Sequence, residues 1–214
     1  MARPFIHVNC AMSADGKIAG PERKQIRISS DEDIARVKQL RRDYDGILVG
    51  AGTVIADDPH LTVKGLSYEE NPVRFVLDRA GRTPQNARVL DMNARTVIIT
   101  GTDCETVWDD ADTIRADSLC TAVKAIGDLG IKSLLVEGGG ETIASFFRCG
   151  LVDRYTVFVG SQIIGGRTAP TPVDGDDRIG SDETIITLED AEILGNGVLL
   201  TYAVSNHCDK ELSE

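Results

Sequence analysis

Residues 46–59 read Gly-Ile-Leu-Val-Gly-Ala-Gly-Thr-Val-Ile-Ala-Asp-Asp-Pro, and they distinguish between two kinds of α/β fold. The first five residues form a short apolar run, which is typical of a strand buried in a parallel sheet. Gly50, Gly52 and Ile55 occupy the glycine positions of the dinucleotide-binding pattern Gly-x-Gly-x-x-Gly, so the third glycine is missing. No acidic residue follows at a strand end about 20 residues later, as that pattern requires. The stretch therefore argues against a Rossmann fold and predicts a strand, a glycine bend, a short turn and an Asp-Asp-Pro stop.

The rest of the chain alternates between strands and helices. Apolar residues alternate from Ile6 to Met12 and predict a strand, and Ser30 followed by three acidic residues predicts a helix start. Further strands are expected at 73–77, 96–100 and 133–136, and helices at 118–129 and 141–149. The end of the chain differs, with strands expected at 154–160, 184–189 and 198–204 and a hairpin turn at 195–197. We therefore predict an α/β fold with a mostly parallel central sheet, helices on both faces and an antiparallel C-terminal edge.

Length and composition predict one domain. A single core can sustain 214 residues of which 42% are apolar. We expect one domain over residues 1–214, with a core at 4–204 and a flexible tail at 205–214. No apolar run is long enough to cross a membrane and the start leads directly into a strand, so a cytoplasmic location is expected. The five cysteines, at 10, 104, 120, 149 and 208, show no Cys-x-x-Cys spacing, which favours free thiols.

The formal net charge of −11 limits the possible partners. There are 22 Asp and 12 Glu against 16 Arg and only 7 Lys. This balance argues against a nucleic-acid partner, which requires basic patches. The excess of Asp over Lys fits either a salt-rich cytosol, where dense carboxylates keep a protein hydrated, or ordinary acidic solubility. In both cases an anionic ligand must be held by local cations against an unfavourable overall field.

Two further segments place polar groups at the ends of predicted strands. In residues 9–18 the first strand runs into the turn Asp15-Gly16, at the end where open α/β sheets bind ligands, although Asp-Gly is also common in plain turns. Residues 136–142 read Val-Glu-Gly-Gly-Gly-Glu-Thr, and three glycines between a strand and a helix let backbone N–H groups converge on a phosphate. The loop lacks the Gly-Lys-Ser/Thr of a P-loop, so nucleotide hydrolysis is not expected. Glu137 stands beside this loop, which favours a role in ligand binding.

Other common catalytic sites find no support in the sequence. His7, His60 and His207 are scattered and form no metal-binding set, and a core or sheet-face role is expected for His7 within the first strand. There is no Gly-x-Ser-x-Gly elbow and no zinc-deaminase signature, so hydrolase and deaminase chemistry are unsupported. Thr53 and Asp57 are four residues apart, and we expect them to share one face of a single turn.

Several motifs occur in the order in which they are found in one enzyme family. They are Met12-Ser-Ala-Asp-Gly-Lys, Ile28-Ser-Ser, Gly52-Thr-Val-x-x-Asp-Asp-Pro-x-Leu-Thr-Val, Asn71-Pro-Val-Arg, Glu137-Gly-Gly-Gly, Gly150-Leu-Val-Asp and Ile164-Gly-Gly. From residue 4 to about residue 204 the chain resembles the archaeal 2,5-diamino-6-ribosylamino-4(3H)-pyrimidinone 5′-phosphate reductases and the reductase half of the bacterial riboflavin-biosynthesis deaminase–reductase. The deaminase half is absent, which fits the stand-alone archaeal form.

The resemblance implies a fold, a reaction and an assembly. The fold would be similar to dihydrofolate reductase, and the protein would be a homodimer. The enzyme would use NADPH, with NADH possible, to reduce a ribosylamine to a ribitylamine in riboflavin biosynthesis. The partner is then a small phosphorylated pyrimidine, with no membrane, no nucleic acid and no metal. Two alternatives stay open, namely a dihydrofolate or pterin reductase of the same fold and a non-catalytic dinucleotide-binding module.

The resemblance also assigns residues to the two ligands. Positions that match the cofactor site are Ala11, Thr53, Asp57, Arg79, Gly138, Gly139, Gly140, Glu141 and Thr142. Positions that match the substrate site are Ser29, Arg41, Leu61, Lys64 and Glu137. Two of these residues depart from the family. Lys64 stands where the bacterial enzymes carry Arg, and Arg79 stands where relatives usually carry Ser, near the expected adenosine ribose. No catalytic proton donor is assigned.

Overall fold

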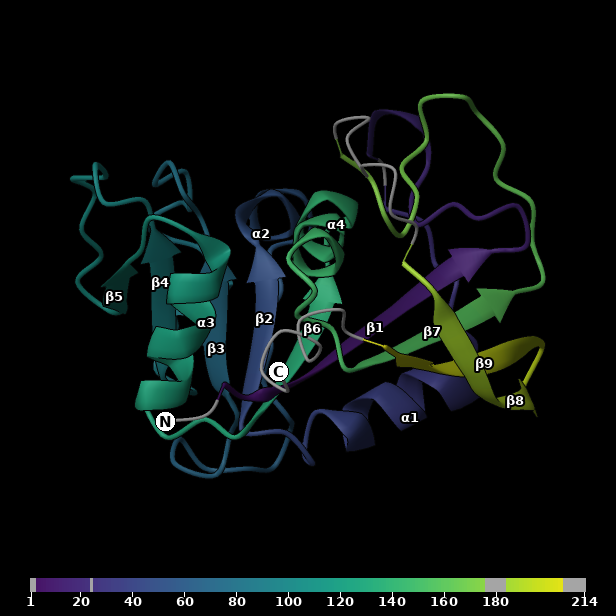
Figure 1. The fold of residues 1–214 in the computed structure, drawn as a ribbon, viewed down its shortest axis with the longest axis horizontal. Helices are drawn as coiled ribbons and strands as arrows, with labels where there is room; N and C mark the ends of the chain where they lie inside the picture. Colours follow the sequence, from purple (N-terminus) through teal and green to yellow (C-terminus); the bar gives the residue numbers. More distant parts are fainter. Residues whose placement is uncertain (1–2, 24, 176–183, 206–214) are drawn as a thin grey trace, which may run out of the picture. The chain divides into compact units, whose positions relative to one another are not determined.

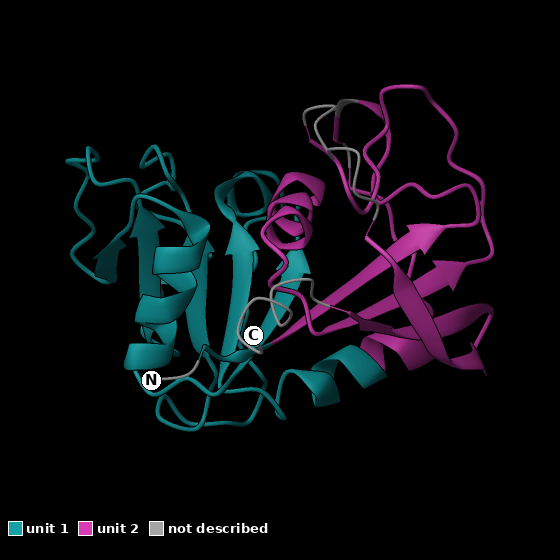
Figure 2. Ribbon diagram, viewed as in Figure 1, with its two compact units in different colours: residues 1–5, 36–139 teal, residues 6–35, 140–214 magenta. Residues whose placement is uncertain are grey.

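The computed structural model describes residues 3–23, 25–175 and 184–205. The chain divides into two compact units, which are shown in different colours in Figure 2. Unit 1 consists of Met1–Phe5 and Arg36–Gly139, and unit 2 of Ile6–Ala35 and Gly140–Glu214. Most of the expected C-terminal tail, including His207 and Cys208, lies outside the described residues. No helix in the described part of the chain is long and apolar enough to cross a membrane.

Unit 1 is built on a parallel sheet (Figure 1). Its strands are Gly46–Gly50 (β2), Val73–Leu77 (β3), Thr96–Thr100 (β4), Asp112–Arg115 (β5) and Ser133–Gly138 (β6). They lie in the order β5-β4-β3-β2-β6, and every neighbouring pair is parallel. All residues of β2 and β4 are buried, which explains why the three central residues of each strand are apolar. The sequence does not predict β5, because this edge strand is exposed or half-buried and carries no apolar run.

The helices of unit 1 follow the strands in the expected α/β order. Ser118 starts α3 (Leu119–Asp128) with a capping box, in which its hydroxyl accepts the N–H of Thr121 and its own N–H donates to the Thr121 hydroxyl. The glycine bend and turn that we expected after β2 are instead a short helix, α2 (Ala51–Asp57). This helix forms because Ala51 and Val54, three residues apart, are both buried in the core of unit 1.

Unit 2 contains the antiparallel part of the fold. Its strands are Phe5–Ser13 (β1), Arg154–Gly160 (β7), Ile186–Leu194 (β8) and Gly197–Val204 (β9), in the order β1-β7-β9-β8. The first pair is parallel and the other two are antiparallel. The predicted α/β class, with a mostly parallel sheet and an antiparallel C-terminal edge, is therefore confirmed. β8 starts two residues later than expected and continues to Leu194, because it pairs with β9 up to the hairpin turn.

The start of α1 (Asp31–Leu40) agrees with its sequence. The hydroxyl of Ser30 accepts the N–H of Asp33 at 3.1 Å, as expected of a capping residue. In β1 the alternation of polar and apolar residues does not mark a solvent-facing side, since His7 and Asn9 are also buried. Nε2 of His7 lies 2.8 Å from the hydroxyl of Thr156, and the expected core role of His7 is confirmed. α1 is divided between the two units at Ala35 and Arg36, and α4 (Gly140–Arg148) lies in unit 2.

Candidate active site

Arg41 and Glu137 form a charged pair within unit 1. Glu137 lies near the carboxyl end of β6, at a register irregularity against β2, and Arg41 follows the last residue of α1. Nε of Arg41 donates to both carboxylate oxygens at 3.0 Å, and one terminal nitrogen donates to Oε2 at 2.7 Å. Burial lowers the pKa of Arg41, but the charge and the hydrogen bonds of Glu137 outweigh it and raise the net pKa. The structure thus brings together two residues that we expected on the substrate side.

This contact changes the interpretation of Arg41. The side chain of Glu137 is only 7% exposed, and that of Arg41 is 25% exposed. The single Nε–H of Arg41 is shared between the two carboxylate oxygens, so the guanidinium uses two of its five N–H donors on Glu137, and the carboxylate offsets its positive charge. Arg41 is therefore placed to fix the carboxylate of Glu137, and a direct contact of its guanidinium with the substrate gains no support from this geometry.

The glycine loop begins at the tip of β6. Gly139 has a φ of 71°, a left-handed conformation that L side chains rarely adopt. A Cβ atom on Gly138 would lie 3.4 Å from the hydroxyl of Thr53, so Thr53 of α2 lies beside this loop. Asp57, at the end of α2, is an exposed residue. Its carboxyl group is nevertheless partly shielded from water by neighbouring atoms, and this partial burial raises its pKa. Thr53 and Gly138 are thus brought together in unit 1.

The part of the loop that belongs to unit 2 is held by neighbours in that unit. The carbonyl of Gly140 accepts the N–H of Asp174 at 3.2 Å, and a Cβ atom there would collide with the carbonyl of Thr171. Close packing is thus enough to require glycine at position 140. Glu141 is exposed and pairs with Arg23 at 2.6 Å, and Thr142 is buried. The side chain of Thr142 is thus withdrawn from the surface, whereas that of Glu141 lies in an exposed ion pair.

Leu61 is held in an uncommon backbone conformation. Its φ is 52°, and its side chain is 3% exposed within the core of unit 1. The main chain before and after Leu61 is fixed by two buried side chains, one in β3 and one just before it. The carbonyl of His60 accepts from Arg74 at 3.2 Å, and the N–H of Val63 donates to Oδ1 of Asn71 at 2.8 Å. Any contact that Leu61 makes with a substrate must therefore come from its main chain.

A network of charged side chains supports the same segment. Arg74 has no exposed surface and donates to the carboxylate of Asp91 at 2.7 Å. Asp91 also contacts Nδ1 of His60 at 2.8 Å, while Nε of Arg88 donates to Nε2 of His60 at 2.9 Å. Because Arg88 can only donate, Nε2 of His60 accepts and Nδ1 carries the proton in this arrangement. Partial burial raises the pKa of Asp91, but hydrogen bonds from Arg74, Asn93 and His60 outweigh it and lower the pKa to about 2.

Sequence reasoning missed this network, which the Asn71-Pro-Val-Arg motif could have revealed. A buried arginine at the start of a strand requires a carboxylate and carbonyl groups as partners. The sequence places Asp91 and His60 within 20 residues of Arg74, but it does not show which loop returns to meet the strand.

Lys64 and Arg79 are exposed cations. The carbonyl of Lys64 accepts a hydrogen bond from Arg42 at 3.4 Å. Arg79 forms no ion pair within the described residues, although Asp78 precedes it directly. The buried carboxylate of Asp78 instead accepts from the N–H and the hydroxyl of Thr83 at 2.6 and 2.7 Å. Arg79 therefore remains available to an anionic ligand.

In unit 2, the turn that follows β1 is joined to the Ile164-Gly-Gly motif. The carboxylate of Asp15 accepts from the hydroxyl of Ser13 at 2.6 Å and from the N–H groups of Ile164 and Gly165 at 3.0 and 2.7 Å. These hydrogen bonds lower the pKa of Asp15 to about 2, that of Ser13 having the largest effect. Asp15 thus connects two motifs 149 residues apart in sequence. Ala11, half-buried in β1, precedes this turn.

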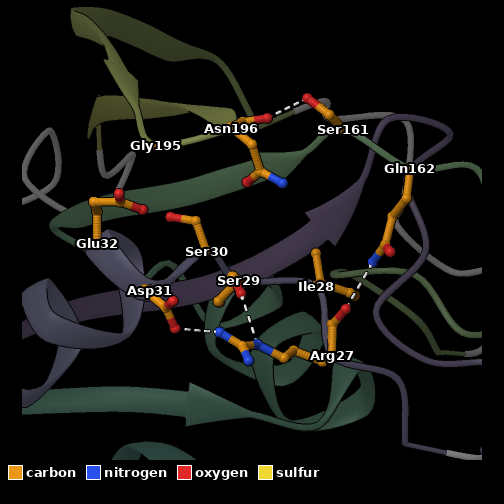
Figure 3. A pocket seen from close by; sticks show the side chains of 10 residues that line it. All are labelled: Arg27, Ile28, Ser29, Ser30, Asp31, Glu32, Ser161, Gln162, Gly195 and Asn196. Atoms are coloured by element: carbon orange, nitrogen blue, oxygen red, sulfur yellow. Dashed lines mark hydrogen bonds and ion pairs between the residues drawn. The ribbon is translucent and has the colours of Figure 1, made fainter.

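Ser29 lines a polar pocket of about 420 Å³ in unit 2 (Figure 3). Its wall combines the residues before α1 with the β8–β9 turn and the two residues after β7. Arg27 pairs with Asp31 at 2.5 Å, and its carbonyl accepts from Gln162 at 3.1 Å. The carbonyl of Asn196 accepts the hydroxyl of Ser161. The side chains of Arg27, Asp31, Ser161 and Gln162 are thus already paired, as the dashed lines in Figure 3 show.

Comparison with known proteins places these residues in a family context. The RibD C-terminal domain family matches residues 4–200. The chain is 36% identical over 222 residues to the 2,5-diamino-6-ribosylamino-4(3H)-pyrimidinone 5′-phosphate reductase of Archaeoglobus fulgidus, covering 93% of this chain and 97% of that protein. It is 38% identical over 216 residues to the enzyme of the same name from Methanothermobacter thermautotrophicus, covering 94% and 99%.

A solved structure supports the same relationship. It is a diaminohydroxyphosphoribosylaminopyrimidine deaminase/5-amino-6-(5-phosphoribosylamino)uracil reductase from Thermotoga maritima. The two chains superpose with a TM-score of 0.79 at 28% identity, over 95% of this chain and 57% of that one. The expected likeness to the dihydrofolate reductase fold is thereby confirmed.

Proposed function

The chain belongs to the RibD C-terminal domain family, and on this basis we propose that it is a pyrimidine reductase of riboflavin biosynthesis. Its substrate would be 2,5-diamino-6-ribosylamino-4(3H)-pyrimidinone 5′-phosphate, the compound in the names of the two archaeal relatives. The product would be the ribitylamino compound. The observation that carries this proposal is the carboxylate of Glu137, which Arg41 holds at the tip of β6 immediately before the glycine loop.

The proposed cofactor is NADPH, for which NADH is a possible substitute. Its fit to this chain rests on two observations, namely the left-handed backbone of Gly139 and the side chain of Thr53 beside Gly138. The residues that we assign to it are Ala11, Thr53, Asp57, Arg79, Gly138, Gly139, Gly140, Glu141 and Thr142. Of these, Gly140 and Thr142 would contribute main-chain groups, because a Cβ atom at Gly140 would collide with the carbonyl of Thr171 and the side chain of Thr142 is buried. When bound, the cofactor supplies a hydride for the anomeric carbon of the ring-opened ribosylamine.

The role of the protein is to orient the substrate and to bind its polar and charged groups. The Glu137 carboxylate accepts hydrogen bonds from an amino-substituted pyrimidine edge, which charged oxygens do better than neutral ones. Because Arg41 fixes this carboxylate beforehand, the acceptor needs little rearrangement when the substrate binds. Leu61 contributes main-chain groups, and Ser29 and Lys64 complete the substrate assignment. We assign no proton donor from the chain, and solvent or a substrate hydroxyl supplies the proton.

We further propose a cytoplasmic homodimer in which residues 1–214 act as one reductase domain. The support for a dimer is β8, the last strand in the order of unit 2. Along it, Leu188 and Ile193 are 53% and 83% exposed. An exposed edge strand with apolar side chains tends to pair with another chain. Light scattering coupled to size-exclusion chromatography tests this assembly, and a mass of one 23.1 kDa chain would contradict it.

An activity comparison tests the proposed reaction. We expect the purified protein to oxidise NADPH when given the ribosylaminopyrimidine phosphate, and not when given dihydrofolate. Oxidation with dihydrofolate alone would support a folate or pterin reductase of the same fold. Binding of NADPH without turnover of either compound would indicate a non-catalytic dinucleotide-binding module.

A further inference from the structure

The connection that follows β7 begins with an irregular segment, residues 161–175, which we call the strap. Together with the turn after β1 and helix α4, it lies in unit 2 (Figure 2). Irregular connections longer than about 12–15 residues are uncommon in compact domains, and those that are ordered usually have a function. Hydrogen bonds hold this one at two places, the turn after β1 and the start of α4. The strap is therefore an ordered part of unit 2 and a candidate for a role beyond connection.

The first anchor of the strap is the carboxylate of Asp15, in the turn after β1. One of its oxygens accepts the N–H of Ile164 at 3.0 Å, and the other accepts the N–H of Gly165 at 2.7 Å. Further hydrogen bonds join the same two segments, from Ala14 to Gln162, from Lys17 to Ala169 and from Ile18 to Pro170. These bonds lie on both sides of the Asp15 contact, so the turn holds the strap along several residues.

The second anchor is Asp174, near the other end of the strap. Its Oδ1 accepts the N–H of Thr171 at 3.1 Å and the hydroxyl of Thr171 at 2.6 Å, which closes a turn. The N–H of Asp174 donates to the carbonyl of Gly140, the first residue of α4, at 3.2 Å. The carbonyl of Thr171 lies so close to Gly140 that a Cβ atom there would collide with it. This turn of the strap is thus packed directly against the start of α4.

The two anchors are neighbours in the chain and are joined by a stiff stretch. Pro170, whose carbonyl accepts from Ile18, directly precedes Thr171, and Pro172 directly follows it. Proline fixes φ at about −65°, and the residue before a proline is restricted as well. Because this stretch can bend little, a displacement at the Asp15 end is passed on to the Asp174 end.

We propose that Asp15 and Asp174 are positioning residues, which act through the strap on the first turn of α4 and so determine the affinity for the cofactor. This inference rests on the proposed function, which assigns Gly140 and the residues after it to the cofactor. N–H groups at a helix start bind a pyrophosphate only if they converge on it, so the position of that start matters. A helix start that is held beforehand loses little entropy on binding. Neither carboxylate contacts the cofactor, whose phosphates would repel it.

The affinity for NADPH, measured by fluorescence titration, tests the two anchors. In Asp15→Asn the amide has only one acceptor oxygen, so one N–H of the strap loses its partner. We expect the Kd for NADPH to rise by about twofold to tenfold, the range of one hydrogen bond. Asp174→Ala removes the acceptor of Thr171 and should have an effect of similar size. In both variants kcat at saturating NADPH and KM for the pyrimidine should stay within about twofold, because neither residue contacts the reacting atoms.

The double variant shows whether the two anchors act through one segment. A strap that is released at one end cannot hold the other end. The increase in Kd when Asp15→Asn and Asp174→Ala are combined should therefore be smaller than the product of the two single increases. Single increases that simply multiply would show two independent anchors and overturn the coupling. Parental Kd values in both single variants would overturn the role of the strap in cofactor binding.

A matched control is Asp117→Asn. Asp117 is also an exposed aspartate whose carboxylate accepts a side-chain hydroxyl, that of Thr121 at 2.6 Å, but it lies before α3 in unit 1. Its substitution removes the same charge, and the Kd for NADPH should stay at the parental value. A loss of affinity as large as that of Asp15→Asn would show that the net charge, and not the strap, determines the affinity.

Amide hydrogen exchange in the cofactor-free protein separates this inference from the proposed function. The N–H of Asp174 donates to Gly140, so its exchange rate reports on the second anchor. Asp15→Asn should speed this exchange by about twofold to tenfold, as measured by NMR, and Asp117→Asn should not. If the parent binds no NADPH but shows this pattern, the strap stands and the proposed cofactor fails. If the parent reduces the pyrimidine but Asp15→Asn leaves the exchange at Asp174 unchanged, the reaction stands and the strap does not transmit.

Discussion

At the scale of single residues, the function depends most on the carboxylate of Glu137. We expect Glu137→Gln to lower kcat/KM for the pyrimidine by about tenfold to a thousandfold, or about 1.4–4 kcal/mol. The amide keeps the shape of the side chain but loses the charge that meets the substrate and holds Arg41. Steady-state kinetics at saturating NADPH measure this loss, and circular dichroism shows whether the fold is retained. A variant with parental kcat/KM would remove Glu137 from the substrate site.

The sequence predicted the neighbourhood of Glu137 better than its contacts. A strand that ends in Glu-Gly-Gly-Gly indicated a carboxylate beside an anion-binding loop, and Thr53 does lie next to Gly138. The pairing of Arg41 with Glu137 was not predicted, because both residues were assigned to the ligand and 96 positions separate them. The burial of Leu61 was missed for a similar reason. A motif position shows that a residue matters but not whether its side chain or its main chain makes the contact.

At the scale of elements, the segment between α2 and β3 is kept in place by two side chains. They are Asn71, which precedes β3, and Arg74, which lies in it. We expect Asn71→Ala to lower the free energy of unfolding by about 1–3 kcal/mol, because the N–H of Val63 loses its buried acceptor. The left-handed conformation of Leu61 is then less well supported. Urea unfolding measures this change, and the exposed Asn86→Ala serves as the control. Equal stability of the two variants would show that the segment does not depend on Asn71.

The same segment should respond to acid through Asp91. Its pKa in the folded protein is about 2, below the ordinary value of 3.8, so the folded state favours the ionised carboxylate. The stabilisation is complete above the ordinary value and is lost as the pH falls from about 4 towards about 2. We expect Asp91→Asn to be less stable than the parent at pH 7, with the difference shrinking over this range. A difference that stays constant between pH 5 and pH 2 would contradict the ionic role of Asp91.

Which elements the sequence could predict depended on their burial. The fully buried β2 and β4 each have three consecutive apolar residues at their centre, and both were predicted with correct bounds. The edge strands β5 and β8 were missed or misplaced, because they have exposed residues and carry no hydrophobic pattern. α2 was taken for a turn, since its seven residues are too short to show a helical period. Long-range pairing and local burial, not propensity, determine these elements.

At the scale of the whole molecule, the acidic charge should make stability depend on salt. We expect the melting temperature to rise by several degrees between low salt and about 1 M KCl, where charges are screened beyond about 3 Å. Repulsion among the 34 acidic side chains is the cause. Differential scanning calorimetry in KCl measures the trend, and the same series in an uncharged osmolyte controls for general stabilisation. A melting temperature independent of KCl would leave ordinary acidic solubility as the interpretation.

Transfer of a labelled hydride tests the central claim most directly. The purified protein is given the ribosylaminopyrimidine phosphate with NADPH deuterated at C4 of the nicotinamide, in separate reactions for each of the two faces. With one of the two labelled cofactors, we predict a ribitylamino product one mass unit heavier, with deuterium on C1′ in its NMR spectrum. A ribitylamino product without deuterium from either cofactor, or no such product at all, would contradict the account.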